Sequence, residues 1–265
     1  MTPAETYERY YVPAMFRPWA AILLRHAAPQ PEERLLDVAC GTGIVAREAA
    51  PLIGAHGRVA ALDMNEAMLA VARAATPPSG ADIEWQEGNA MALPYADASF
   101  DLVVCQHGLQ FFPDRVAALR EMRRVLAPGG RVLVMVLQAL DRHPVFEALM
   151  TSVAAQLSLP IAAVTTPFAL ADAAELRALF ASAGFEAVAV VPESTRVSFT
   201  EPDRFVQLAV TSSAAAVPAF AELDGPDRAS LLEAVRIDVD ATLQTYREAS
   251  AISFPMFAHV VSATR

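Results

Sequence analysis

The chain has 265 residues and a mass of 28.3 kDa, which is enough for one substantial α/β domain with an elaboration and too little for two ordinary domains with linkers. Its net charge of −10 and pI near 5.0 exclude a typical nucleic-acid partner, because phosphate backbones are bound mainly by clustered Lys and Arg. No apolar run approaches the roughly 20 residues of a membrane-spanning helix, so no membrane partner is expected. The first residues lack the basic and apolar regions of a secretory signal, and we expect a cytoplasmic protein.

Metal binding and disulfide formation are not indicated by the cysteines. Only Cys40 and Cys105 are present, and they show neither a C-x-x-C nor a Cys/His ligand spacing. We therefore predict two free thiols and no metal site.

The predicted elements alternate between strands and helices. Residues 7–28 begin with an aromatic-rich lead and continue as a helical pattern, which Pro29 and Pro31 end. Strands are expected at residues 34–38, 58–62, 83–86, 100–105, 131–137, 185–191 and 257–263, with helices after Gly43, Asn65, Pro113 and Asp172. This alternation predicts a largely parallel sheet with helices on both faces and a ligand beyond the carboxyl ends of the strands.

Two segments, residues 141–170 and 200–250, do not fit the alternation and look helical. We assign them, together with residues 1–28, to a helical cap over the binding crevice. The prediction is one domain spanning 1–265, with a core at about 29–140, 171–192 and 254–265.

The most informative segment is the run from Leu35 to Gly43, where a buried strand turns into a helix. Gly41, Gly43 and Ala46 read as G-x-G-x-x-A, and Asp63 lies about 20 residues further on, as in a dinucleotide-binding fingerprint. A dehydrogenase strand is usually apolar at the position of Asp37, whereas a ligand that carries a cation would justify a carboxylate there. Both interpretations remain open from this segment alone.

Further turns along the chain decide between a dehydrogenase and a protein that binds a cationic ligand. Gly88-Asn89-Ala90 follows the third strand, the segments 92–101 and 106–114 flank the fourth, and Pro128-Gly129-Gly130 precedes the fifth. With Asp37-x-Ala39-x-Gly41-x-Gly43, this series resembles the class I S-adenosylmethionine-dependent methyltransferases of the ubiquinone and menaquinone biosynthesis group (methyltransferase type 11). The resemblance implies a Rossmann-like, seven-stranded sheet with the last strand antiparallel. It also implies S-adenosylmethionine as cofactor and S-adenosylhomocysteine as product.

The resemblance assigns roles to particular residues. Asp37 lies near the amino acid end of the cofactor, Asp63 holds the two ribose hydroxyls, and Met64 packs on the adenine face. Ala39 replaces the family's usual first glycine, and Asn89 replaces an aspartate at the adenine edge. The implied cofactor-binding residues are Asp37, Ala39, Gly41, Thr42, Gly43, Asp63, Met64, Gly88, Asn89, Ala90 and Gln106.

His107 is the one candidate base, because it follows a buried strand at its carboxyl end. The aromatic residues Tyr11, Phe16, Trp19 and Phe111 are expected to contact a small, largely apolar acceptor. Methyl transfer is an in-line displacement that depends on alignment and exclusion of water, so the attacking atom (O, N, S or C) is not defined by the sequence. Three alternatives remain: an NAD(P)-dependent oxidoreductase, a non-catalytic protein that binds S-adenosylmethionine, and methylation of a protein or lipid acceptor, which no basic or membrane-seeking patch favours. Oligomeric state is not indicated.

Overall fold

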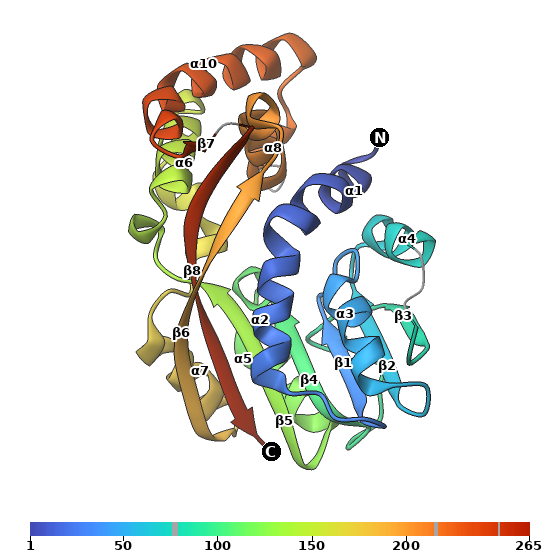
Figure 1. Cartoon of the computed structure of the whole chain (residues 1–265). Helices are drawn as coiled ribbons and strands as arrows, with labels where there is room; N and C mark the ends of the chain where they lie inside the picture. The colour runs from blue at the N-terminus through green and yellow to red at the C-terminus, as the bar shows by residue number, and fades with distance from the viewer. Residues whose placement is uncertain (76–78, 215–216, 249) are drawn as a thin grey trace. The chain divides into compact units, whose positions relative to one another are not determined.

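The structure, a computed structural model, describes residues 1–75, 79–214, 217–248 and 250–265. These residues form two compact units (Figure 1). Unit 1 contains Met1–Leu137, Leu170–Glu193 and Ala258–Arg265, and unit 2 contains Gln138–Ala169 and Ser194–Phe257.

The core of unit 1 is a mixed sheet with the strand order β3-β2-β1-β4-β5-β8-β6. The strands are β1 (Arg34–Val38), β2 (Arg58–Asp63), β3 (Ile83–Glu87), β4 (Phe100–Gln106), β5 (Leu126–Leu137), β6 (Glu186–Phe199) and β8 (Ala251–Thr264). β1 to β5 pair in parallel, whereas β8 runs antiparallel to β5. This confirms the predicted seven-strand path and its antiparallel last strand. The chain order reverses between β1 and β4, which is where open α/β sheets bind ligands.

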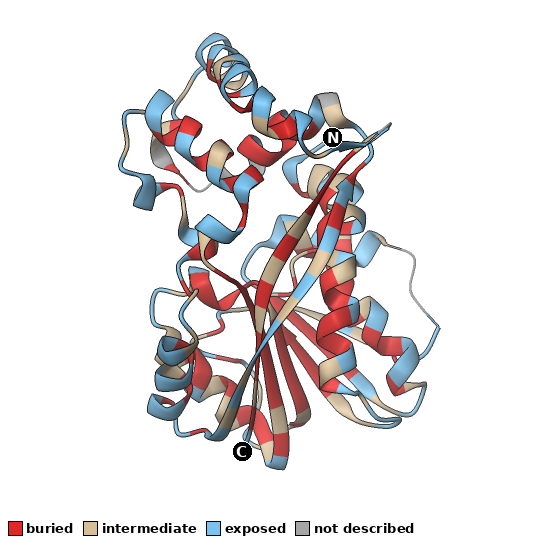
Figure 2. Ribbon diagram, turned by 60° about the vertical axis from the view of Figure 1, so that its left-hand side comes forward, coloured by how far each residue is buried: buried red, intermediate tan, exposed pale blue. Residues whose placement is uncertain are grey.

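Helices cover both faces of this sheet, which is why its central strands are almost wholly buried (Figure 2). On one face α2 (Arg17–Ala27) packs on α3 (Ile44–Ile53) and on β4 and β5. On the other face α5 (Arg115–Val125) packs against α7 (Ala173–Ser182), over a core that includes alternate residues of the strands. A further helix, α4 (Glu66–Ala74), contacts β2 and β3 and begins at the predicted N-cap Asn65.

The N-terminal residues belong to unit 1 rather than grouping with the other segments that we expected to form the cap. The short helix α1 (Pro3–Thr6) leads into a π-helix, η1 (Tyr7–Phe16), and then α2. Pro13 has no N–H to donate, and the N–H of Arg17 reaches the carbonyl of Val12, five residues back, as in a π-helix. The buried face of α2, with Trp19 and Leu23, attaches this region to the sheet.

Unit 2 is mainly helical, as predicted for residues 141–170 and 200–250. Its helices are α6 (Pro144–Gln156), α8 (Pro202–Ala214), α9 (Pro218–Ala221) and α10 (Gly225–Gln244), with single turns at Leu140–Arg142, Ile161–Ala163 and Thr166–Phe168. A two-residue strand, β7 (Arg247–Glu248), pairs with β8. α6 packs on α10, where the Ser152 hydroxyl donates to Asp238 at 2.6 Å. A capping role for this unit remains a prediction.

His143 is a buried polar residue of unit 2. Its Nδ1 lies 2.9 Å from the carbonyl oxygen of Ala139, and its Nε2 lies 3.0 Å from the N–H of Phe257. A neutral ring that donates from Nδ1 and accepts at Nε2 fits both contacts. Burial lowers the pKa of His143 from its ordinary value, so the fold disfavours the charged form of this ring.

The free energy of unfolding should therefore fall as the pH drops. The unfolded chain takes up a proton on His143 below about pH 6.5 more readily than the folded chain, so stability is lost as the pH falls from about 6.5 to about 5. Urea denaturation of wild type and of His143→Gln over this range measures the effect, since the variant lacks the titrating group. Parallel pH profiles for the two proteins would contradict the expectation.

Candidate active site

The predicted glycine turn joins β1 to α3 in left-handed backbone. Ala39, Gly41 and Gly43 have φ angles of 58°, 55° and 84°. A Cβ atom on Gly43 would lie 2.2 Å from the ring of Trp85, so this position accepts only glycine. Ala39 adopts the same unfavourable region, which explains in physical terms why glycine is the family's usual residue there.

Asp37 lies beneath this turn and is 1% exposed. Its Oδ2 accepts a hydrogen bond from the N–H of Ala46 at 3.2 Å, whereas Oδ1 has no partner among the atoms of the described residues. Burial, and secondarily the charge of Asp63, raise the pKa of Asp37 to about 8. A buried carboxyl with a free acceptor is a site at which a cationic ligand would be favourable.

Asp63 is the last residue of β2 and forms hydrogen bonds with the turns that follow β1, β2 and β3. Its Oδ2 accepts from the N–H of Gly41 at 2.8 Å, and its Oδ1 accepts from the N–H of Asn65 at 2.9 Å. The carbonyl of Asp63 accepts from the N–H of Gly88 at 3.0 Å. The ends of β1, β2 and β3 are therefore adjacent, as the sequence predicted.

The other predicted adenine-side residues flank Asp63. Met64, next in the chain, is 79% exposed, so its side chain is available at the edge of the site. Asn89 is exposed, and its Oδ1 accepts from the N–H of Met91 at 2.9 Å, which shapes the turn after β3. Ala90 is buried in the core below this turn.

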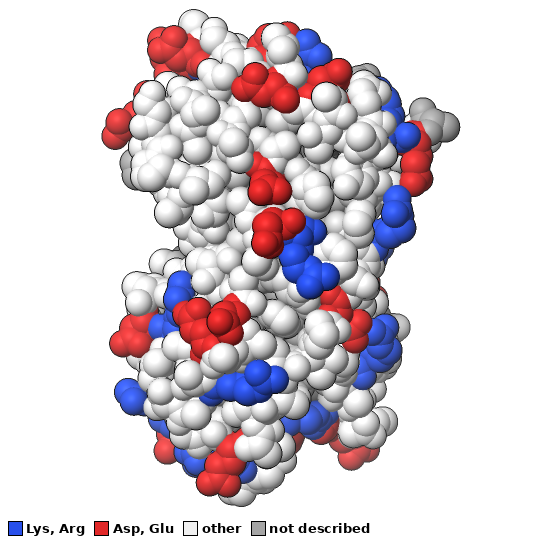
Figure 3. Space-filling view, turned by 90° about the vertical axis from the view of Figure 1, so that its left-hand side faces the viewer, with Lys and Arg blue, Asp and Glu red and all other residues white. Residues whose placement is uncertain are grey.

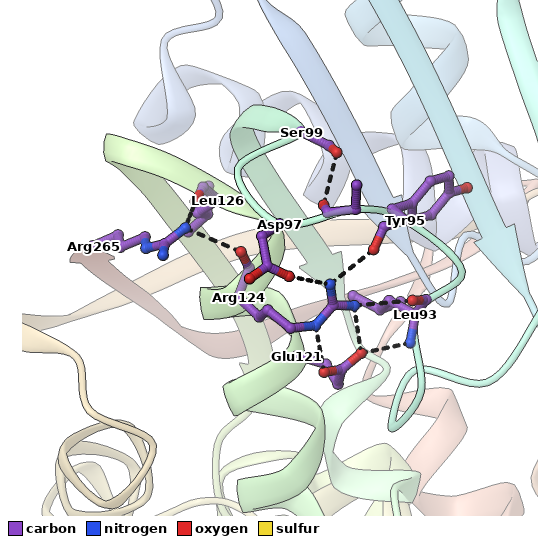
Figure 4. A network of polar contacts seen from close by, with 9 residues as sticks. Leu93, Tyr95, Asp97, Ser99, Glu121, Arg124, Leu126 and Arg265 are labelled. Carbon is purple, nitrogen blue, oxygen red and sulfur yellow. Dashed lines mark hydrogen bonds and ion pairs between the residues drawn. The ribbon is translucent and has the colours of Figure 1, made fainter.

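Arg124 of α5 fixes the loop that follows this turn (Figure 4). Its guanidinium donates to the carbonyl oxygens of Leu93 and Tyr95 and to the Asp97 carboxylate, at 3.0, 2.8 and 2.8 Å. Glu121 holds the guanidinium from the other side and also accepts from the N–H of Leu93 at 2.8 Å. The loop after Asn89 is thus held by charge-assisted hydrogen bonds.

Arg124→Ala should lower the free energy of unfolding by about 2–3 kcal/mol, because two carbonyls and two carboxylates lose their shared donor. Arg124→Lys should recover only part of the loss, since an ammonium cannot present the planar fork of donors. Chemical denaturation of the three proteins measures this. Equal stability of the Ala variant and wild type would show that the loop does not depend on this residue.

At the end of β4, Gln106 and His107 lie beside the N-terminal region. The Nε2 of Gln106 donates to the carbonyl of Phe16 at 3.0 Å, and its Oε1 has no partner among the described atoms. His107 has a φ of 53°, a strained conformation of the kind that concentrates at functional sites. Its ring lies 6.1 Å from that of Phe16 and 5.9 Å from that of Trp19.

The predicted acceptor-contacting aromatics divide into two kinds. Trp19 is fully buried and Tyr11 is nearly so, while Phe16 is partly exposed and lies against both Tyr11 and His107. Phe111, in the single turn Leu109–Phe111, is 51% exposed. The structure therefore brings Phe16, Trp19 and His107 together, and places Tyr11 behind them in the core.

Three residues at the site were not predicted. A Cβ atom on Gly41 would lie 3.9 Å from the hydroxyl of Tyr7, whose pKa is raised by burial and by the nearby Asp63. Arg47 donates to the carbonyl of Thr42 within the turn and pairs with Glu8 at 2.7 Å. Glu8 and Arg47 are 39 residues apart and belong to no motif, so the sequence gives no signal for this pair; Tyr7 is signalled only by the aromatic run.

These residues fit a cofactor that carries positive charge and hydrogen-bonding groups. Buried oxygens without partners among the described residues lie on Asp37 and Thr42, at the glycine turn, and on Gln106 at the end of β4. Acidic side chains at the ends of both β1 and β2 favour a ligand with a positive charge over an anionic pyrophosphate. Within the described ranges, no group of three His, Cys, Asp or Glu side chains is arranged as metal ligands.

Both cysteines are free and buried, and burial raises the pKa of the Cys105 thiol to about 12. On the molecular face drawn in Figure 3, acidic and basic side chains are interspersed rather than gathered into a basic surface. No helix among the described residues has the length and apolarity needed to cross a membrane.

The strand order, the antiparallel β8 and the three linked turns define a class I methyltransferase fold. The model of the ubiE/COQ5 methyltransferase family matches residues 14–157, and the chain belongs to this family. S-adenosylmethionine is accordingly its cofactor, and the oxidoreductase alternative finds no support.

Curated relatives match about half of the chain. The chain is 36% identical over 138 residues to a 2-phytyl-1,4-naphtoquinone methyltransferase of Synechococcus elongatus, covering 51% of this chain and 57% of the relative. It is 38% identical over 119 residues to the ubiquinone/menaquinone biosynthesis C-methyltransferase UbiE of Shewanella frigidimarina, covering 44% and 47%. The chain thus spans about half the length of the curated relatives it matches.

Solved structures extend the likeness of fold to nearly the whole chain. The YcgJ protein of Bacillus subtilis has a TM-score of 0.59 at 19% identity, covering 93% of this chain and 97% of that one. A phosphoethanolamine N-methyltransferase of Haemonchus contortus, in complex with S-adenosylhomocysteine, has a TM-score of 0.55 at 18% identity, covering 94% and 52%. At these identities the likeness concerns the fold alone.

Proposed function

We propose that this protein transfers a methyl group from S-adenosylmethionine to a small, largely apolar acceptor in the cytoplasm. The observation that carries the proposal is the buried Asp37, which has an unpaired oxygen beneath the glycine turn, one strand away from Asp63. Two carboxylates at adjacent strand ends favour a ligand that presents a cation and a ribose. The cofactor, when bound, supplies a methyl group activated on a positively charged sulfur.

The chain's own residues then bind, orient and exclude water. Asp63 offers two carboxylate oxygens to vicinal hydroxyls, Met64 an exposed apolar side chain, and Asp37 a negative charge. Phe16 and Trp19, whose rings both contact that of His107, supply apolar surroundings that would keep water from the acceptor. We assign to His107 the role of taking a proton from an acceptor hydroxyl, amine or thiol, while an acidic phenol or enol needs no base.

Calorimetric titration with S-adenosylmethionine, S-adenosylhomocysteine and NAD tests the cofactor. We expect binding of the first two and none of NAD, whereas tight NAD binding would overturn the proposal. Methyl transfer from radiolabelled cofactor is then measured on a panel of small phenols, amines, thiols and quinones, the last because the matched relatives are named for quinone substrates. Binding without transfer to any acceptor would identify a non-catalytic cofactor-binding protein.

A further inference from the structure

The π-helix Tyr7–Phe16 is attached at both ends to residues of the cofactor site. Near its start, Glu8 Oε1 accepts from Arg47 Nη2 at 2.7 Å, and at its end the carbonyl of Phe16 accepts from Gln106 Nε2 at 3.0 Å. Arg47 lies in the first turn of α3, directly after the glycine turn, and Gln106 is the last residue of β4. One attachment therefore comes from the helix that directly follows the predicted cofactor-binding turn, and the other from the predicted cofactor-binding residue Gln106.

Arg47 links the glycine turn to the π-helix. It donates to the carbonyl of Thr42 inside the glycine turn and to the carboxylate of Glu8 in the π-helix. The side chains of Arg47 and Glu8 are only 11% and 26% exposed. Screening by solvent and salt is weak for such a pair, so it contributes more than a surface ion pair does.

A second ion pair between the N-terminal region and α3 provides a comparison for Glu8 and Arg47. Arg17, at the start of α2, pairs with Glu48 of α3 at 3.4 Å, and these side chains are 58% and 44% exposed. This second ion pair also links the N-terminal region to α3, but it touches no residue of the glycine turn. It is a matched control for the first.

Tyr7, the residue before Glu8, lies next to the glycine turn. Its ring lies tilted against that of Phe16, with centroids 4.8 Å apart, and its hydroxyl is the atom nearest to where a Cβ of Gly41 would lie. The π-helical backbone is intrinsically unfavourable over ten residues and contains Pro13, so its position depends on side-chain attachments. A ligand that reaches Gly41 must contact Tyr7 or displace it.

We propose that Glu8 and Arg47 are positioning residues, which hold the segment Tyr7–Phe16 against the glycine turn and thereby set how long the cofactor stays bound. The inference rests on the proposed function, because it assumes that the turn binds the cofactor. Glu8 acts through Tyr7, and Arg47 acts through Thr42 and Glu8. Neither side chain takes part in the chemistry.

Dissociation of S-adenosylhomocysteine tests the proposal without turnover. Glu8→Gln keeps the size of the side chain and removes its charge. We expect the dissociation constant to rise threefold to tenfold, mainly because the ligand dissociates faster. Glu48→Gln removes the matched surface carboxylate and should change both quantities less than twofold. Equal effects of the two substitutions would overturn the proposal.

A double-mutant cycle shows whether Glu8 acts through Arg47. Arg47→Gln retains an amide donor for the carbonyl of Thr42 but loses the charge that Glu8 pairs with. Glu8→Gln in this background should have no further effect on dissociation, because the pair is already broken. An undiminished effect of Glu8→Gln there would show that Glu8 does not work through Arg47.

Hydrogen exchange separates failure of this proposal from failure of the proposed function. In the free protein, Glu8→Gln should accelerate exchange of the Tyr7–Phe16 amides severalfold while the β4 amides are unchanged, and Glu48→Gln should accelerate neither. If wild type bound neither S-adenosylmethionine nor S-adenosylhomocysteine, the proposed function would fail and the role in cofactor retention with it. If wild type bound them and the segment's exchange did not change in Glu8→Gln, only the positioning proposal would fail.

Discussion

Replacing Asp63 with Ala should weaken binding of S-adenosylmethionine by roughly 100-fold or more. A carboxylate that accepts from two vicinal hydroxyls makes two charge-assisted hydrogen bonds, each worth about 1.5–3 kcal/mol. Asp63→Asn keeps one acceptor oxygen and should lose about tenfold. Isothermal titration calorimetry of the three proteins with S-adenosylhomocysteine, which does not react, measures the effect directly.

The same carboxylate also accepts from the backbone N–H groups of Gly41 and Asn65, so its removal lowers stability as well. Asp101→Ala is the matched control. Asp101 pairs with Arg34 at 2.7 Å at the opposite end of the sheet, where the strands begin. That variant should lose stability yet keep its cofactor affinity within about twofold. Unchanged affinity in Asp63→Ala would remove Asp63 from the binding site.

The parts of the fold that the sequence predicts are those with local signals. Strand β1, the glycine turn and α3 follow from one continuous segment, and Asn65 and Asp172 cap α4 and α7 as their spacing predicts. Each such signal involves residues within a few positions of each other, where backbone geometry leaves few alternatives. The adjacency of the strand ends then follows from the parallel sheet.

Features that depend on distant contacts were missed. β6 and β8 were predicted at residues 185–191 and 257–263 but extend over Glu186–Phe199 and Ala251–Thr264. Their added residues belong largely to unit 2, where Phe199 and Phe254 pack together with ring centroids 6.2 Å apart. Alternation along a strand carries no information about such a partner, because the pairing decides how far the strand continues.

In the candidate site, too, residues in local motifs were predicted and residues joined by distant contacts were not. Asp37, Gly41, Gly43 and Asp63 are found from short motifs, and the structure joins Gly41 to Asp63 directly. The pair Glu8 and Arg47 is created by the path of the N-terminal segment. The grouping of residues 1–28 with the sheet was likewise not predicted, because an apolar helix face does not identify the surface that it covers.

Asp37→Asn should make the protein more stable at alkaline pH and weaken its binding of the cofactor. The pKa of Asp37 is raised to about 8 in the folded chain, above the value of about 4 in an unfolded one, mainly because the carboxyl is buried. Between these values the folded state holds a proton that the unfolded state has released. The free energy of unfolding therefore falls as the pH rises from about 4 to about 8.

The amide cannot ionise, so the variant is free of this loss, and its stability relative to wild type should rise by several kcal/mol between about pH 5 and pH 9. It retains an oxygen that can accept from the N–H of Ala46. Urea denaturation at pH 5, 7 and 9 measures the difference. A wild-type advantage that grew with pH would mean that Asp37 is ionised and satisfied in the folded protein.

The affinity of wild type for the cofactor should rise with pH, whereas its stability falls. A cation near Asp37 favours the ionised carboxylate and lowers its pKa, so binding releases a proton and the affinity of wild type should rise about tenfold between pH 6 and pH 8. Asp37→Asn should bind more weakly at pH 8 and show a flat profile, while Asp101→Asn should follow the wild-type curve. In wild type the buried carboxyl therefore lowers the free energy of unfolding at high pH but supplies the negative charge that strengthens cofactor binding. Such a conflict between stability and function is typical of binding sites. If both proteins showed the same pH profile, the ligand's positive charge would lie elsewhere in the site.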